Sequence, residues 1–354
     1  MKLVIFGLAV SSSWGNGHAV LWRALIRAFG ERGHQTVFFE RNVPYYAQNR
    51  DLYSLEGGRL VLYDDWGAVL PEARRELVDA DAGIVTSYCP DAFAATELVL
   101  DTSALHVFYD LDTPVTLSQL AAGKSVAYIG RDGLAPFDLV LSYTGGTALS
   151  VLRERLGARR VAALYGSVDT ERYRPAMPAN GERAALSYLG TYAEDRQAAL
   201  EGLLIEPARR RPQLRFIIGG AQYPANFPWA ANIRFWRHVP SHEHPRFYGS
   251  AQMTLNITRQ AMIAFGWCPS GRLFEAAACG TPILSDWWEG LDEFFAPGQE
   301  IIIAATTDDV LAALERSDAE LAKIGAAARE RALARHTAER RAAELEMLLS
   351  QFEE

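Results

Sequence analysis

Along the first forty residues, the apolar positions change from an unbroken run to a helical repeat and back to a run. Residues 2–9 are apolar after Lys2, which predicts a buried strand. After a loop at 10–18, apolar residues recur at the three- and four-residue spacing of one helix face: Leu21, Ala24, Leu25, Ala28 and Phe29. Gly33 ends this predicted helix, and residues 36–40 form the next apolar run. The order of strand, glycine-containing loop, helix and strand predicts the start of a βαβ unit.

Short apolar runs recur along the rest of the chain, separated by helical or loop segments. They lie at 60–63, 83–86, 105–109, 139–143, 161–165, 186–190, 215–218, 233–236, 253–257, 282–284 and 301–303. Such alternation predicts an α/β fold with parallel sheets that helices cover on both faces.

A turn-rich segment at 173–181, with two prolines, an asparagine and a glycine, divides these runs into two sets. We therefore predict one α/β domain over residues 1–174 and a second over 175–330. The remaining segment, 331–354, keeps a helical apolar stripe near its end: Leu345, Leu348, Leu349 and Phe352. We expect this terminal helix to pack back on the first domain.

Composition narrows the class of protein. The 354 residues are too many for one typical core and suit two domains, and the net charge of −8 excludes a global basic field for nucleic acid or anionic lipid. Cys89, Cys268 and Cys279 show neither metal-site spacing nor a disulfide framework, so we expect a reducing cytoplasm. The N-terminus lacks a signal-peptide pattern, and no apolar run approaches the roughly 20 residues of a membrane span.

The loop before the first helix contains Gly15 and Gly17. A G-x-G sequence after a strand is part of the dinucleotide-binding pattern, and Glu40 ends the second strand, where an acid would hold a ribose. However, Val20 stands at the place of the third glycine, and the loop is longer than the tight turn of that pattern. The loop therefore either lines a binding crevice at the carboxyl end of a strand or serves helix packing alone.

An acidic pair follows the apolar run at 105–109. Asp110 and Asp112 end this predicted strand just before Thr113 and Pro114. Carboxylates at the carboxyl end of a parallel strand point into the ligand crevice of an α/β sheet. Either one can act as a general base or bind hydroxyls, and the alternative is that Asp112 only caps the turn.

Residues 268–284 have the pattern of a loop, a short helix, a glycine stop and a buried strand. The backbone N–H groups at Ser270 and Gly271, together with the charge of Arg272, predict an anion site at the start of this helix. Glu275 lies about one turn further on, where a carboxylate can reach sugar hydroxyls. The alternative is a capped core helix that carries one acid.

Three other places carry weaker signals. Arg196, near a predicted helix start, can contact a phosphate, although exposed arginines are common. Asp286 precedes two tryptophans, which is typical of a sugar-binding edge and equally of an apolar domain edge. His238, His242 and His244 have metal-like spacing, but the prolines among them favour exposed loop histidines, so we predict no metal site.

Several segments, in chain order, resemble the GT-B glycosyltransferases. Residues 28–37 are similar to the end of the first helix in that superfamily, and residues 164–175 resemble the segment before its interdomain linker. Residues 268–284 resemble the donor-site segment of glycosyltransferase family 4. Within the superfamily, residues 270–292 are most similar to the spore-maturation CgeB-like glycosyltransferases.

This resemblance implies two Rossmann-like domains that face each other across a cleft, with the nucleotide-sugar donor mainly on the second domain and the acceptor on the first. Glu275 matches the family glutamate that binds the ribose, and Ser270 and Gly271 match the loop whose backbone approaches the diphosphate. Arg196 lies where family 4 usually has a phosphate-binding lysine.

The first domain also has counterparts in the family. Gly15 and Gly17 match a glycine loop near the diphosphate and the donor sugar, and we count the adjoining His18 among the catalytic candidates. Asp110 or Asp112 falls near the place where many members keep an active-site histidine.

Two positions depart from the family pattern. Trp267 stands where family 4 has the first of two glutamates, and Thr191 stands where an arginine usually follows Gly190. Both changes affect the groups that hold the donor sugar and diphosphate, so neither the donor nor retention of configuration follows from the resemblance.

We therefore predict a metal-independent glycosyltransferase without a cofactor, which uses a nucleotide-diphosphate sugar, expected to be UDP-linked, and an unidentified acceptor. Arg196, Arg272 and the helix start would bind the diphosphate, Asp286 would hold sugar hydroxyls, and Asp112 is the first candidate base. Two alternatives stay open: a sugar-nucleotide epimerase or phosphorylase on the same fold, and a non-catalytic partner in polysaccharide assembly.

Overall fold

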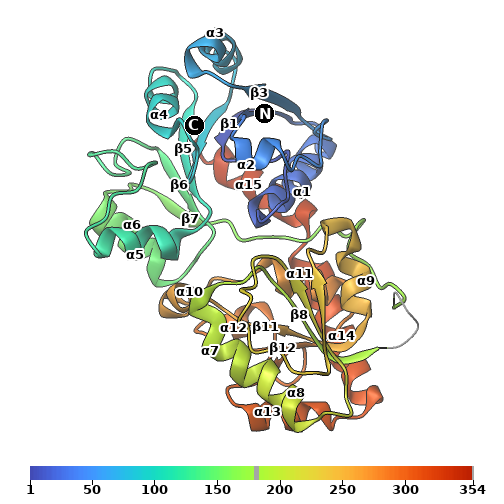
Figure 1. The fold of residues 1–354 in the computed structure, drawn as a ribbon. Coiled ribbons are helices and arrows are strands. Elements are labelled where there is room, and N and C mark those ends of the chain that lie inside the picture. Colours follow the sequence, from blue (N-terminus) through green and yellow to red (C-terminus); the bar gives the residue numbers. More distant parts are fainter. Residues whose placement is uncertain (179–182, 353–354) are drawn as a thin grey trace. The chain divides into compact units, whose positions relative to one another are not determined.

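The computed structural model describes residues 1–178 and 183–352, and the chain forms two compact units (Figure 1). Unit 1 contains residues 1–167 and returns at Ala338, and unit 2 contains Val168–Thr337. The boundaries that we expect from the sequence are 174/175 and 330/331. Residues 179–182 of the turn-rich segment lie outside the described residues.

Unit 1 is built on a seven-stranded parallel sheet with the order β3-β2-β1-β4-β5-β6-β7. Its strands are β1 (Lys2–Gly7), β2 (Gln35–Arg41), β3 (Arg59–Tyr63), β4 (Ala82–Thr86), β5 (Leu105–Asp110), β6 (Leu139–Ser142) and β7 (Val161–Ala163). Its helices are α1 (Gly17–Glu31), α2 (Pro44–Ala47), α3 (Trp66–Leu77), α4 (Ala92–Leu100), α5 (Thr113–Ala121), α6 (Thr147–Leu156) and α15 (Ala338–Ser350).

Unit 2 is built on a six-stranded parallel sheet with the order β10-β9-β8-β11-β12-β13. Its strands are β8 (Ala184–Leu189), β9 (Phe216–Gly220), β10 (Ile233–Arg237), β11 (Ala251–Asn256), β12 (Ile283–Ser285) and β13 (Ile302–Ile303). Its α-helices are α7 (Gln197–Leu200), α8 (Glu206–Arg210), α9 (His244–Gly249), α10 (Gln260–Phe265), α11 (Gly271–Ala278), α12 (Leu291–Phe294), α13 (Thr307–Leu314) and α14 (Asp318–Arg335).

The strand order reverses once in each sheet, between β1 and β4 in unit 1 and between β8 and β11 in unit 2. Because crossovers between parallel strands are right-handed, helices on the two sides of such a point cover opposite faces of the sheet. A crevice opens there at the carboxyl ends of the strands, and ligands of open α/β sheets bind in it. The topology therefore directs attention to the loops after β1 and β4 and after β8 and β11.

Every apolar run predicted as a strand overlaps one of these strands, so the predicted α/β fold class is confirmed. The terminal segment is also helical, although α14 continues to Arg335 and the last helix begins at Ala338. This helix α15 packs beside α1 (Figure 1), where Ala342, Leu345 and Leu349 join the core that includes Leu25 and Phe29. The C-terminal helix therefore closes the core of unit 1.

Candidate active site

The start of helix α11 lies at the carboxyl edge of the sheet of unit 2. Ser270 is its N-cap residue, but the hydroxyl makes no capping hydrogen bond. Instead, Ser270 Oγ donates to Asn256 Oδ1 at 2.8 Å, which ties the helix start to the end of β11. The backbone N–H groups of the first turn are not capped by this side chain, and a Cβ at Gly271 would come near the Glu275 carboxylate alone, at 3.9 Å. The geometry suits an anion.

Two arginines lie close to this helix start. Arg272 Nη1 donates to Asn256 Oδ1 at 3.0 Å, and its guanidinium lies 5.3 Å from the ring centroid of Tyr188. Gly190 permits this arrangement, because a Cβ there would come within 3.0 Å of Arg272 Nη2. Arg196 Nη2 donates to the carbonyl oxygen of Thr191 at 2.6 Å.

The electrostatics of the two guanidinium groups also favour an anion. Burial lowers the pKa of Arg196, and the nearby positive charge of Arg272 lowers it further. Neither arginine forms an ion pair with an acid in the part of the chain that the structure describes. The Nε atom of Arg196 is buried without a hydrogen-bond partner there. A bound diphosphate would neutralise this paired positive charge.

Glu275 lies one turn into α11 and is mostly buried, with 15% of its side chain exposed. Tyr248 donates its hydroxyl to Glu275 Oε2 at 3.0 Å, and His244 Nδ1 lies 3.5 Å from the same oxygen. Burial acts to raise the pKa of Glu275, but His244, Tyr248 and Arg272 outweigh it and hold the pKa below its ordinary value. Glu275 therefore stays ionised at neutral pH and can accept hydrogen bonds from hydroxyls.

Asp286 follows β12 at the same edge of the sheet. Its carboxylate accepts hydrogen bonds from the backbone N–H of Thr258 at 2.8 Å and from the Thr258 hydroxyl at 2.9 Å. Burial raises the pKa of Asp286, although these bonds counteract it. The two tryptophans that follow differ, because Trp287 is 48% exposed whereas Trp288 is buried.

Trp267, which occupies the position of the expected carboxylate, lies in a tight backbone turn with φ of 40°. Its indole N–H donates to Glu293 at 2.8 Å, and its ring packs on Gly290, where a Cβ would come within 2.5 Å. The tryptophan therefore has a structural role in this loop, and Asn256 and Asp286 are the polar side chains that the two neighbouring strands bring to the site.

In unit 1, the loop with Gly15 and Gly17 leads into helix α1. Asn16 caps this helix, and its Oδ1 accepts the backbone N–H of His18 at 3.2 Å. Glu40 is fully buried and binds the loop itself, since it accepts the backbone N–H groups of Val10 at 2.7 Å and Ser11 at 2.8 Å. Glu40 therefore supports the loop and does not project to hold a ribose, which removes the main support for the dinucleotide alternative.

Asp112 lies beside β4 and β5 and is half-buried. Tyr88, whose φ of 64° is unusual for a tyrosine, donates its hydroxyl to Asp112 Oδ2 at 3.0 Å. The ring of His18 lies 6.2 Å from that of Tyr88. Packing around the half-buried His18 lowers its pKa, and the charge of Asp112 opposes this change. His18, Tyr88 and Asp112 thus form one polar cluster, which the sequence did not predict because Tyr88 lies far from the other two in the chain.

Asp110 differs from Asp112 because it is fully buried. Its Oδ1 accepts the backbone N–H of Asp112 and the hydroxyl of Thr116, each at 3.1 Å, whereas Oδ2 has no partner at hydrogen-bond distance. Burial raises the pKa of Asp110 to about 6, although the N–H of Asp112 and the hydroxyls of Thr116 and Ser87 counteract it. Asp110 is placed to orient the Asp112 backbone and does not itself reach the surface.

The histidines of the loop before α9 are not all exposed, as the sequence led us to expect. His242 is 76% exposed, but His244 is only 17% exposed and lies against Glu275. Within residues 1–178 and 183–352, no group of three or more His, Cys, Asp or Glu side chains converges as metal ligands would. In the same part of the chain, no helix has the length and apolar character to cross a membrane.

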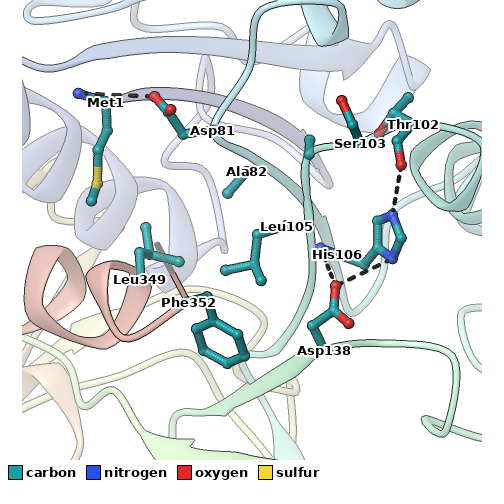
Figure 2. A pocket seen from close by; sticks show the side chains of 11 residues that line it. Met1, Asp81, Ala82, Thr102, Ser103, Leu105, His106, Asp138, Leu349 and Phe352 are labelled. Atoms are coloured by element: carbon teal, nitrogen blue, oxygen red, sulfur yellow. Dashed lines mark hydrogen bonds and ion pairs between the residues drawn. The ribbon is translucent and has the colours of Figure 1, made fainter. Parts of the chain in front are cut away.

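Each unit has a cavity at the edge of its sheet where the strands begin, which is opposite the carboxyl edge that carries the predicted site residues. A cavity of about 410 Å³ in unit 1 is lined by Leu105 and Phe352 and by the His106–Asp138 pair, whose ring nitrogen and carboxylate lie 3.3 Å apart (Figure 2). A cavity of about 480 Å³ in unit 2 is lined by Gly249 and Pro282, among others. Both lie near the beginnings of strands, and none of the predicted site residues lines either one.

Comparison with known proteins agrees with this geometry. A family model described as "Glycosyl transferase-like" matches residues 196–347, which contain Arg196, Arg272, Glu275 and Asp286. Sucrose-phosphate synthase from Thermosynechococcus elongatus is 14% identical with a TM-score of 0.72, over 99% of this chain and 98% of that one. The chain has the GT-B fold and carries a glycosyl transferase-like domain.

Other solved glycosyltransferase-fold structures are similar along the whole chain. HepE from Anabaena, solved with UDP and glucose, is 12% identical with a TM-score of 0.68, over 99% of this chain and 100% of that one. An alpha-glucosyltransferase solved with UDP-glucose and DNA is 12% identical with a TM-score of 0.68, over 99% of each chain. A search of curated proteins by sequence found no match. The predicted enzyme class, a glycosyltransferase, is thus confirmed by the family match, whereas the CgeB-like subfamily stays a prediction.

Proposed function

We propose that this glycosyltransferase transfers a sugar from a nucleotide-diphosphate donor, a UDP-sugar, to an acceptor hydroxyl. The observation that carries the proposal is the pair of arginines without acidic partners, Arg196 and Arg272, beside the uncapped start of α11. Two similar proteins were solved with UDP or UDP-glucose, which supports the uridine nucleotide as the ligand class.

On this proposal the residues of unit 2 bind the donor. The N–H groups at the start of α11 and the two guanidinium groups bind the diphosphate and stabilise the charge that develops on it as the bond to the sugar breaks. Glu275 accepts hydrogen bonds from the ribose hydroxyls, and Asp286 accepts them from the sugar. These groups supply the positive charge that a metal ion provides elsewhere, which supports a metal-independent reaction without a cofactor.

The polar cluster of unit 1 supplies the acceptor chemistry. In an inverting transfer, the acceptor oxygen attacks the anomeric carbon, the bond from that carbon to the diphosphate oxygen breaks, and Asp112 takes the acceptor proton. In a retaining transfer, Asp112 orients the acceptor instead. Tyr88 and His18 position or tune the carboxylate, and Gly15 and Gly17 let the loop approach a ligand closely. A cytoplasmic location and the CgeB-like assignment are part of the same proposal.

Isothermal titration with UDP and UDP-glucose tests the donor site. The wild type should bind both, and Glu275→Ala should weaken both by on the order of tenfold, because a charged acceptor of ribose hydroxyls is lost. Glu330→Ala, which removes an exposed acid of the same unit, is the matched control and should leave affinity unchanged. Unchanged affinity in Glu275→Ala would make the ribose assignment wrong.

The same preparations separate the alternatives. An epimerase would convert UDP-glucose into an epimer without an acceptor, and a phosphorylase would require inorganic phosphate, so product analysis under each condition identifies either one. The non-catalytic alternative is motivated by Trp267 and Thr191, which replace two family side chains with neutral groups. It predicts nucleotide-sugar binding without turnover, whereas absence of any binding by the wild type would overturn the proposed donor class.

A further inference from the structure

A cluster of three side chains surrounds the carboxylate of Glu275 inside unit 2. Tyr248 of α9 donates to Oε2, and His244, the first residue of α9, lies 3.5 Å from the same atom. Tyr173, which lies before β8, places its hydroxyl 3.2 Å from His244 Nδ1. The other carboxylate oxygen, Oε1, lies on the side of Gly271, where a Cβ would be 3.9 Å away. Oε2 thus belongs to the cluster, and Oε1 faces the helix start.

The hydrogen bonds of His244 determine which ring nitrogen can change its proton. Nε2 lies 3.2 Å from the carbonyl oxygen of Val239. A carbonyl oxygen only accepts, so Nε2 carries a hydrogen in every protonation state of the ring. Gain or loss of a proton therefore occurs at Nδ1, the atom that faces Glu275 and Tyr173.

The two protonation states of His244 differ in the hydrogen bonds that they offer to the Glu275 carboxylate. When Nδ1 carries a proton, it donates a charge-assisted hydrogen bond to Oε2. When Nδ1 is bare, its lone pair faces the negative Oε2 and can accept the hydroxyl hydrogen of Tyr173. The first state adds a second donor to Oε2, and the second state leaves Tyr248 as its donor and places a lone pair opposite the negative oxygen.

We propose that His244 is a proton-dependent positioning residue for Glu275, whose protonated ring anchors Oε2 and leaves Oε1 available to a hydroxyl of the bound nucleotide. The inference rests on the proposed function, because it assumes that Glu275 binds the nucleotide. It follows that the affinity for a nucleotide sugar decreases when the ring loses the proton on Nδ1.

The other ionisable groups that face the cluster each stay in one protonation state near neutral pH. Burial raises the pKa of the hydroxyls of Tyr173 and Tyr248 and of the thiol of Cys279, and Glu275 raises each further, so all three stay neutral. Arg272 stays positive, as arginines do. At the start of α9, the N-cap residue Glu243 and Arg246 lie 3.6 Å apart at the surface, and His242 in the preceding turn is exposed. Histidine is the side chain that titrates between about pH 5 and 8.

The test is the dissociation constant of UDP-glucose for the whole chain, measured by titration calorimetry from about pH 5.5 to 8.5. The phosphates of UDP-glucose are diesters and do not titrate in this window, unlike the terminal phosphate of UDP. Wild-type affinity should fall by on the order of tenfold across the window, since the proton and the ligand are linked through one carboxylate. His244→Gln keeps a donor that does not titrate and should remove most of this pH dependence.

His242→Gln is the matched control, because it removes an exposed histidine two residues away and should keep the wild-type profile. Thermal unfolding of each variant checks that the fold is intact, and His244→Asn provides a second variant if His244→Gln is unstable. The inference is overturned if the affinity of the wild type for UDP-glucose does not change with pH, or if a folded His244 variant shows the same pH dependence as the wild type. Either result leaves the donor assignment standing. Absence of UDP-glucose binding at every pH overturns the proposed function, and this inference with it.

Discussion

The two units share one strand order around the switch point, yet the carboxyl edges of their sheets carry different functional groups. In unit 2, Arg196 and Arg272 meet at the start of α11 without an acidic partner among the described residues. In unit 1, Asp110 and Asp112 lie at the carboxyl end of β5, which neighbours β4 in the sheet, and Tyr88 donates a hydrogen bond to Asp112. The same scaffold therefore presents an anion site in one unit and a base in the other, because chemistry resides in the loops and not in the fold.

The acids at the corresponding strand ends also differ in the hydrogen bonds that their carboxylate oxygens accept. Asp286 follows β12, and both of its carboxylate oxygens accept hydrogen bonds from Thr258. Asp110 ends β5, and one of its oxygens is buried without a partner. Unit 2 thus stabilises its acid locally, whereas unit 1 keeps a carboxylate at an energetic cost. Three predictions test this contrast, in order of decreasing effect.

The largest effect should come from the candidate base. In an inverting enzyme, Asp112→Asn should lower kcat by about 100- to 10,000-fold, because the amide cannot accept the acceptor proton. The dissociation constant of UDP-glucose should not change, since unit 2 binds the donor. Steady-state kinetics and calorimetry on one preparation measure both. Tyr88→Phe, which removes one hydrogen bond to the same carboxylate, should cost much less.

A kcat within about twofold of wild type in Asp112→Asn would falsify the assignment of this residue as base. A loss of affinity for UDP-glucose in the same variant would contradict the assignment of donor binding to unit 2 and of the base to unit 1.

The arginines of unit 2 should show the reverse pattern. Arg196→Ala and Arg272→Ala should each weaken UDP-glucose binding by about 10- to 100-fold, because each removes charge-assisted hydrogen bonds to the diphosphate. Uridine, which lacks phosphates, should bind the variants and the wild type equally. Arg209→Ala removes a half-exposed arginine on α8 and serves as the control. If uridine and UDP-glucose lose affinity alike, the arginines act on the fold and not on the diphosphate.

The contrast also shows what the sequence can reveal. The strands were predictable because short, fully buried parallel strands give unbroken apolar runs, and the acids and glycines were predictable because they follow such runs. Asn256 was missed, although its signal was present: it is an amide side chain near the end of the apolar run 253–257. The structure shows that this side chain binds both Ser270 and Arg272.

Other site residues had no local signal. Tyr88 reaches Asp112, and Tyr173 reaches His244, across separations that only the sheet topology bridges. His244 was expected to be exposed because prolines surround it, but Pro245 occupies the first turn of α9, where proline is compatible with a helix. Trp267 was recognised as a departure from a family pattern, and its contact with Gly290 required the structure.

The smallest predicted effect concerns the buried acid of unit 1. The pKa of Asp110 is about 6 in the folded chain and near 3.8 when exposed, so the folded state binds an additional proton between these values. The stability from this group is therefore fully present below about pH 4 and is lost as the pH rises through about 6.

Between pH 4 and 7, the free energy of unfolding of the wild type should fall relative to that of Asp110→Asn by about 1–3 kcal/mol. Urea denaturation at several pH values measures the difference, and Asp132→Asn, at an exposed acid of the same unit, should follow the wild type. Parallel curves for Asp110→Asn and wild type would mean that this carboxylate is satisfied in solution, and the contrast with Asp286 would disappear.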